Sequence, residues 1–288
     1  MSRSVEVVRA APLTTVQDAG RTGLAHLAVP RSGALDRPAY QLANRLVGNP
    51  EGAAVLETTF AGITVRPLVR CHIAVTGAWA TVSVDGRAAP WGLPVMVEPG
   101  QQLVVGDAAR GLRCYIAFSG GIAVTPVLGS RATDLLSGLG PPPLRDGDFL
   151  PLGAPAGPPA AMDCAPYPPP PERLTLRLCR GPRSDWLTAA SLATLTSAQY
   201  TVAATSNRIG LRLTGAELRI RVPTELPSEG VVLGAVEVPP NGQPLIFLAD
   251  HPTTGGYPIV GVVHPSDLPH CAQARPGTPV RLLREPAI

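Results

Sequence analysis

The chain contains no lysine: all 24 of its basic residues are arginine, and with 21 acidic residues its formal net charge is only +3. The absence of lysine excludes a P-loop phosphate site, Schiff-base catalysis and covalently attached biotin, since each of these needs a lysine amine. Arginine stays protonated and cannot act as a general base. The arginines are scattered, which argues against a nucleic-acid-binding surface. Any fixed cation in a site of this protein is therefore an arginine.

Cysteine, histidine and long apolar runs are also scarce. The five cysteines are widely spaced without a CxxC pair, a pattern typical of reduced thiols in the cytoplasm. His264 and His270 have no matching third ligand, so no metal site is expected. The N-terminus lacks an apolar signal core, and no apolar run reaches membrane length. We therefore expect a soluble, cytoplasmic protein without metal ligands that binds neither nucleic acid nor a membrane.

Proline and glycine are abundant, with 34 and 30 residues, while helical periodicity is weak. This composition favours a mainly β fold of short strands joined by turns. The clearest break is the proline-rich segment 151–171, which cannot join a sheet interior and favours extended polyproline conformation. We expect an N-terminal β module over residues 1–150, a linker over 151–171 and a C-terminal β module over 172–288.

Local signals predict several elements. Asp36 is a candidate N-cap for a helix whose apolar face runs from Ala39 to Val47. Asp85-Gly86 predicts a hairpin turn. Ser184 is a candidate cap for a helix that extends to about Leu195. In the C-terminal module we expect a short helix over 267–274 and strands over 174–179, 211–222, 231–238, 245–249 and 259–263.

The stretch 226–263 carries the clearest chemical signal. The apolar run Leu245–Ala249 suits a buried strand that ends at Asp250. Two hydroxyls and two glycines follow at 253–256, and then comes Tyr257. A carboxylate beside bare backbone N–H groups suits a polar site on a rigid base, whereas the same residues also suit a tight hairpin whose glycines serve only the turn. Local chemistry alone leaves both interpretations open.

Four further polar motifs have a similar composition. They are TTVQDAGR at 14–21, SGALD at 32–36, GSRATD at 129–134 and SNRIG at 206–210. Each motif taken singly is more typical of a turn or a cap than of a site. In this order, and together with the NGQP turn and the TTGGYP loop, they resemble the C subunit of bacterial 5-oxoprolinase. That family is also called KipA, or allophanate hydrolase subunit 2, and belongs with the carboxyltransferase domains of urea carboxylase.

The resemblance implies cyclophilin-like β-barrels with a few short helices, and an enzyme made of several subunits. The implied partners are a B subunit of the KipI family and an A subunit of the LamB/YcsF type. Together the three subunits open 5-oxoproline to L-glutamate with ATP hydrolysis, so ATP is expected at the level of the complex. In the urea carboxylase relatives the equivalent domains pass a carboxyl group from biotin to urea, and biotin would here have to arrive on another protein. A third hypothesis is a non-catalytic antagonist that binds a KipI-like kinase inhibitor.

A lactam or urea substrate presents an amide carbonyl, which needs backbone N–H donors and a fixed cation where negative charge develops. We expect Arg208 to supply the cation and Asp250 to orient these groups, both as catalytic residues, with a structural ion pair as the alternative for Arg208. The expected substrate-binding residues are Asn207, Gln243, Thr253, Thr254, Gly255, Gly256 and Tyr257. No Ser-His-Asp order or paired-carboxylate spacing indicates a self-contained hydrolase, so we expect catalysis to need the partner.

Two positions depart from the family pattern. Glu237 stands where a glutamine is usual before Val-Pro, and Pro252 stands where another glutamine often precedes the TTGGYP loop. If either glutamine contacts substrate in the family, the substrate or its geometry differs here. Glu237 is alternatively expected to form a structural salt bridge with an arginine such as Arg208.

Overall fold

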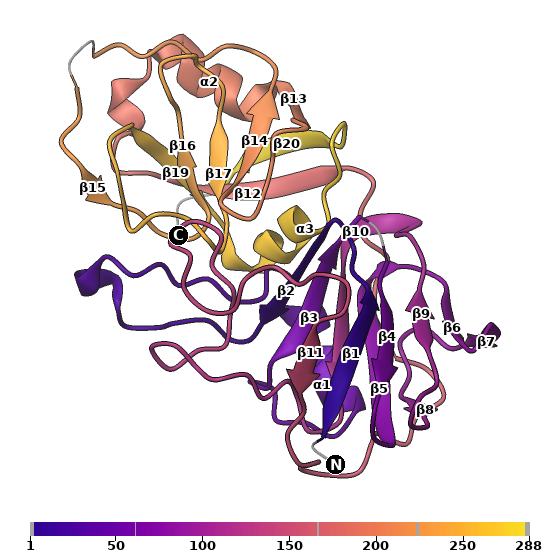
Figure 1. Cartoon of the computed structure of the whole chain (residues 1–288). Helices are drawn as coiled ribbons and strands as arrows, with labels where there is room; N and C mark the ends of the chain where they lie inside the picture. The colour runs from indigo at the N-terminus through magenta and orange to yellow at the C-terminus, as the bar shows by residue number, and fades with distance from the viewer. Residues whose placement is uncertain (1–2, 61, 166, 223–224, 286–288) are drawn as a thin grey trace. The chain divides into compact units, whose positions relative to one another are not determined.

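The computed structural model describes residues 3–60, 62–165, 167–222 and 225–285, and the chain divides into two compact units. Unit 1 comprises Met1–Arg21, Ser32–Asp134 and Gly138–Pro170. Unit 2 comprises Thr22–Arg31, Leu135–Ser137 and Pro171–Ile288. Strands make up most of the regular structure of both units (Figure 1), which confirms the expected mainly β fold.

Unit 1 contains two antiparallel sheets that enclose one apolar core. The first has the order β11-β1-β4-β9-β6-β7, with β1 Ser4–Arg9, β4 Thr64–Pro67, β6 Val82–Val84, β7 Arg87–Ala89, β9 Leu103–Val105 and β11 Phe149–Pro151. The second has the order β2-β3-β10-β5-β8, with β2 Leu13–Gln17, β3 Val55–Thr59, β5 Cys71–Trp79, β8 Val95–Val97 and β10 Arg110–Phe118. The predicted hairpin turn joins β6 to β7, with positive φ at both Asp85 and Gly86.

The predicted helix of unit 1 is α1, Arg37–Leu46, and it packs against β5 and β10. The Asp36 carboxylate caps it by accepting a hydrogen bond from the backbone N–H of Ala39, which confirms the predicted cap. Residues of the proline-rich segment contact the same region. The Tyr167 hydroxyl donates a hydrogen bond to Asp36 Oδ2 at 2.6 Å, and the Ala160 N–H donates one to the carbonyl of Leu46. The segment up to Pro170 thus lies in unit 1, while the domain limits at 150 and 171 stay a prediction.

Unit 2 contains a closed seven-stranded barrel in the order β12-β19-β16-β17-β14-β13-β20. Its strands are β12 Leu174–Arg180, β13 Gln199–Val202, β14 Gly210–Thr214, β16 Ala235–Glu237, β17 Leu245–Phe247, β19 Ile259–Val263 and β20 Pro279–Arg284. The pairing of β12 with β20 is parallel, whereas each other barrel pairing is antiparallel. A separate two-stranded ladder joins β15 Glu229–Gly230 to β18 Thr254–Gly255. The expected barrel is therefore confirmed.

The helices of unit 2 are short, and one of them begins later than predicted. They are the 3-10 helices η1 Ala25–Leu27, η2 Ser184–Trp186 and η3 Pro265–Asp267, and the α-helices α2 Ala189–Ser197 and α3 Leu268–Ala272. Ser184 opens only η2, because Leu187 is extended and interrupts the helix. Thr188 caps α2 instead by accepting a hydrogen bond from the Ser191 N–H. Among the described residues, every helix is too short or too polar to cross a membrane.

Three strands of unit 2 are shorter than predicted, and the one expected over 245–249 ends at Phe247. The strand expected over 211–222 ends at Thr214, because Gly215 is bonded through both its N–H and its carbonyl to the side chain of Gln243. The strand expected over 231–238 begins only at Ala235, after Gly234 with φ +83°. The segments freed from the sheet, around 215–222 and 226–232, form loops beside the barrel. These loops build the cavity described next.

Candidate functional site

Arg208 and Asp250 form a buried ion pair in unit 2, with both side chains 0% exposed. Arg208 Nε donates to Asp250 Oδ2 at 2.9 Å, and Nη2 donates to Oδ1 at 3.0 Å, so the guanidinium contacts both oxygens. The Leu135 N–H also donates to Asp250 Oδ2 at 3.2 Å. Such a two-point pair fixes both geometry and charge. It joins the loop before β14 to the end of β17, and the partner of Arg208 is Asp250 rather than the alternative, Glu237.

Asn207 and Gln243 use their side-chain amides to fold their own loops. Asn207 Oδ1 accepts hydrogen bonds from the N–H groups of Ile209 and Gly210 at 2.9 and 3.2 Å. Gln243 accepts from the Gly215 N–H at 2.9 Å and donates to the Gly215 carbonyl. The Asn207 amide still has both of its N–H donors, and the Gln243 amide keeps one N–H donor and one lone pair. The predicted substrate-binding role of these two residues is not tested by these contacts and stays a prediction.

The TTGGYP loop is a paired ladder rather than an open row of N–H groups. Its β18 residues Thr254 and Gly255 pair with Gly230 and Glu229 of β15. The Val231 N–H also donates to the Thr253 carbonyl at 2.9 Å. The ladder ends at Gly255, and the loop then turns toward solvent, where Tyr257 is 46% exposed. The glycine-rich loop is therefore held in place at 253–255 and open at 256–257.

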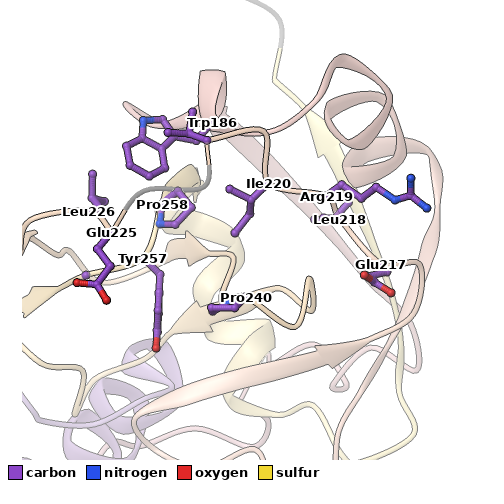
Figure 2. A pocket seen from close by; sticks show the side chains of 12 residues that line it. Trp186, Glu217, Leu218, Arg219, Ile220, Glu225, Leu226, Pro240, Tyr257 and Pro258 are labelled. Carbon is purple, nitrogen blue, oxygen red and sulfur yellow. The ribbon is translucent and has the colours of Figure 1, made fainter.

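An open groove of about 980 Å³ lies next to this loop (Figure 2). Of the predicted site residues, Gly256 and Tyr257 line it. Aromatic and apolar side chains provide much of the wall, with Trp186, Leu218, Ile220, Val222, Leu226, Pro240 and Pro258. Charged side chains add Glu217, Arg219 and Glu225. The groove therefore presents polar and apolar surface in similar amounts, which suits a small polar ligand.

Sequence reasoning missed most of the residues that line the groove. Trp186 comes from η2, Glu217 and Glu225 from the loop after β14, and Pro240 from the turn after β16. These segments are far apart in the chain and carry no shared motif. Only the closing of the barrel brings them together, so nothing in their local sequence could identify them. The isolated Trp186, one of three tryptophans, was the single available signal.

Gln243 lies instead in the wall of a second, smaller hollow of about 500 Å³, together with Arg212 and Asn241. The predicted site residues are thus distributed over three places. Arg208 and Asp250 are buried, Gly256 and Tyr257 line the groove, and Gln243 lines the smaller hollow. The structure brings the loop and the groove together without bringing Arg208 or Asp250 to the surface.

Glu237 is the departure from the family pattern that matters for the groove. Its side chain is buried, with 5% of the residue exposed. Burial raises the pKa of Glu237 to about 7, while the Tyr257 N–H and the positive charge of Arg212 oppose the rise. The other departure, Pro252, provides a carbonyl 2.6 Å from Nδ1 of the neighbouring His251.

Within the described part of the chain, the structure has no group of three or more histidine, cysteine, aspartate or glutamate side chains placed to hold a metal ion. The described residues that line the groove supply carboxylates, one arginine, aromatic rings and backbone groups. This set can bind and orient a small polar molecule. It does not contain a nucleophile with an adjacent base, which a self-contained hydrolase needs.

Comparisons with known proteins agree with this architecture. The family model "Carboxyltransferase domain, subdomain A and B" matches residues 27–284. The C subunit of the 5-oxoprolinase of Escherichia coli strain K12 is 36% identical over 286 residues, which is 97% of this chain and 91% of that protein.

Two solved structures are also similar. The crystal structure of TTHA0988 superposes with a TM-score of 0.87 at 37% identity, over 98% of this chain. This chain spans about half of that one, 55%. The K. lactis urea amidolyase superposes with a TM-score of 0.91 at 27% identity, over 99% of this chain and 19% of that one.

Proposed function

Because this chain belongs to the carboxyltransferase domain family, subdomains A and B, we propose that it is the C subunit of an ATP-dependent 5-oxoprolinase. In this function it works with the A and B subunits to open 5-oxoproline to L-glutamate. The observation that carries the proposal is the likeness to the C subunit of the E. coli 5-oxoprolinase, because it extends over nearly the whole length of both chains.

The make-up of the groove supports a subunit that binds but does not complete the reaction alone. Tyr257 and Gly256 are the predicted site residues that a ligand in the groove would touch. Arg208 and Asp250 hold the base of the loop in place, since both are fully buried. The remaining catalytic groups, and the ATP site, belong to the partner subunits in this proposal. The chain by itself is then inactive.

Reconstitution tests the proposal directly. The purified A, B and C subunits are mixed with 5-oxoproline and ATP, and release of glutamate is measured with and without this chain. We expect glutamate release only when this chain is present. Unchanged release in its absence would refute the proposal.

A substitution in the groove sharpens the experiment. Tyr257→Ala removes an exposed ring from the groove wall, and we expect it to raise the KM for 5-oxoproline at least tenfold. Phe149→Ala is the matched control, because it removes a ring that is similarly exposed, at 58%, from β11 of unit 1. The control should have the kinetics of the unmodified chain.

Carboxyl transfer to urea or a similar amide is the second candidate function. It is favoured by the family model and by the likeness to the urea amidolyase structure. Biotin would reach the groove on another protein, because this chain has no lysine to carry it. Transfer of labelled carboxylate from a carboxylated biotin carrier to urea would establish this function. Binding of a KipI-type partner without turnover of either substrate would instead support an antagonist role.

A further inference from the structure

We propose that Glu237 is a positioning residue of the groove, whose buried carboxyl group fixes the backbone of residues 255–257. The effect on catalysis rests on the proposed function, whereas the effect on the loop does not. The residue is absent from the groove wall itself and acts through Tyr257, which lines it.

The register of the barrel places Glu237 under the loop. On β16 it lies directly opposite Leu245 of β17 and Ile259 of β19. Arg212 of β14 also lies opposite Leu245 and is exposed, so these side chains share the outer face of the barrel. Glu237 is nevertheless 5% exposed, because the ladder of β15 and β18 covers this part of the face.

The carboxyl group contacts the loop closely. A Cβ added to Gly255 would lie 3.1 Å from Glu237 Oε1 and 3.1 Å from Val231 Cγ2, so the carboxyl group packs closely against the backbone of Gly255. The backbone N–H of Tyr257 is also near enough to the carboxyl group to favour its charged form. The contact extends from Gly255 to Tyr257, and it therefore sets the path of the chain where it enters the groove.

The surroundings of Glu237 are unusually poor in positive charge. The neighbouring strands present apolar side chains, since Leu245 and Ile259 pack in one cluster with Val231, Ala235 and Phe247. Arg212 on β14 is the cation that acts on Glu237, and among the described residues no ion pair within 4.0 Å joins the two. On the covering ladder, Glu229 is paired with Arg183.

Other buried acids of the described chain have a close arginine, such as Asp267, which lies 2.7 Å from Arg177. Asp250 contacts Arg208, and Glu57 lies 3.6 Å from the Arg113 guanidinium. A buried carboxylate without such a partner is costly, and the group takes up a proton instead. This agrees with the rise in the pKa of Glu237 to about 7. In the neutral form the carboxyl group can still lie against Gly255 and face the Tyr257 N–H, so the loop keeps its observed position over Glu237, which we call the closed form.

Loss of the proton leaves a buried negative charge with one hydrogen-bond donor. The loop must then move to admit water or to let Arg212 approach. We therefore expect the closed form of residues 253–258 to be favoured below pH 7 and weakened above it.

Hydrogen exchange of the full chain tests the proposal without any partner or substrate. Exchange of the backbone amides of 253–257 is measured at pH 6 and pH 8 and corrected for intrinsic exchange rates. We expect protection to fall about tenfold in the unmodified chain, because pH 8 is about one unit above the pKa. Glu237→Gln keeps the shape and the acceptor but cannot ionise, so its protection should be equal at both pH values. Protection that changes equally in both chains, or in neither, would overturn the proposal.

The control and a second measurement keep the result decisive. Glu217→Gln removes an exposed carboxylate of the groove wall and should respond to pH like the unmodified chain. If Glu237→Gln does not fold, the carboxyl carbons of glutamate in the unmodified chain are titrated by 13C NMR. One resonance with a midpoint near 7 is expected, and midpoints that all lie near 4.5 would refute the assignment.

The reconstituted enzyme then separates this proposal from the proposed function. With 5-oxoproline as substrate, we expect the KM of the unmodified enzyme to rise between pH 6 and pH 8, while the KM of Glu237→Gln stays constant and kcat is similar. If the exchange result holds but no glutamate forms under any condition, the proposed function fails while the role of Glu237 in the loop stands.

Discussion

At the scale of single residues, two buried acidic side chains of unit 2 differ in the groups that they contact. Asp250 contacts Arg208 and joins two loops, whereas Glu237 is buried beside apolar side chains against the backbone of Gly255. The difference follows from the neighbour that each carboxyl group meets, not from its burial, which is similar. Each arrangement leads to a distinct prediction.

Breaking the Arg208–Asp250 pair should destabilise the chain severely. Arg208→Ala leaves a carboxylate buried without its cation, and we expect a loss of about 3–5 kcal/mol in the free energy of unfolding by urea. Arg45→Ala is the control, since it removes a surface pair with Glu51 whose side chains are 52% and 54% exposed, and it should change stability by less than about 1 kcal/mol. Full stability of Arg208→Ala with lost activity in the complex would instead identify Arg208 as catalytic.

The proton on Glu237 should appear in the pH dependence of stability. Because its pKa rises from 4.5 to about 7 on folding, the folded chain binds more protons than the unfolded chain between these values. The contribution of this group to stability is therefore complete below pH 4.5 and is lost as the pH rises toward 7. We expect Glu237→Gln to gain stability relative to the unmodified chain through this window, and the difference to be constant above it. A difference that does not vary with pH would contradict the prediction.

At the scale of elements, α1 depends on one side chain with two tasks. Asp36 caps the helix through the Ala39 N–H and also accepts the hydroxyl proton of Tyr167 at 2.6 Å. This second contact ties the proline-rich segment to the start of the helix. Both tasks lie within unit 1, so the effect of removing them can be compared with that of an ordinary cap elsewhere.

We expect Asp36→Ala to lose more stability than a cap alone provides. A cap contributes about 1 kcal/mol, and a hydrogen bond to a charged group adds about 1.5–3 kcal/mol. Thr188→Ala removes the cap of α2 and a part-buried hydrogen bond to the Ser191 hydroxyl, and it should cost about 1 kcal/mol. Tyr167→Phe removes only the hydrogen bond to Asp36, so its loss of stability should equal the difference between the losses of Asp36→Ala and Thr188→Ala. Equal losses for Asp36→Ala and Thr188→Ala in urea unfolding would show that the Tyr167 bond contributes nothing.

Elements defined by local chemistry were predictable from the sequence. The Asp85-Gly86 turn, the Asp36 cap and the strand over 259–263 each depend on neighbouring residues, and the structure confirms them. The cap at Ser184 was wrong, because Thr188 competes four residues later and Leu187 is extended. The strand predicted over 211–222 was too long, because the Gly215 N–H donates to the side chain of Gln243, which lies on another turn of the chain. The groove could not be predicted, since its walls meet only through the barrel.

At the scale of the whole molecule, the two units share one simple chemical property: their thiols are free. Cys71, Cys114 and Cys271 are buried, whereas Cys164 and Cys179 are exposed. Burial raises the pKa of Cys71 to about 11 and that of Cys114 and Cys271 to about 12, so these three are poor nucleophiles. The reactivity of the native chain should therefore come from the other two.

We expect a thiol reagent such as Ellman's reagent to modify two cysteines in the native chain and five after unfolding. Cys179 should react more slowly than Cys164, because its thiol donates a hydrogen bond to Glu285 that raises its pKa. Cys164→Ser should remove the fast phase and leave the slow one. Modification of three or more thiols in the native chain would contradict the burial of the remaining cysteines.

The order of strands in the barrel of unit 2 also has a consequence for biosynthesis. Strand β20 lies between β12 and β13, although it is the last barrel strand that the ribosome makes. Until residue 284 has emerged, β12 and β13 each expose an unpaired edge, which is a template for pairing with another chain. The nascent chain therefore passes through a period of exposed edges that ends only when β20 is inserted, and a chaperone that shields β12 during that period would raise the yield of folded protein.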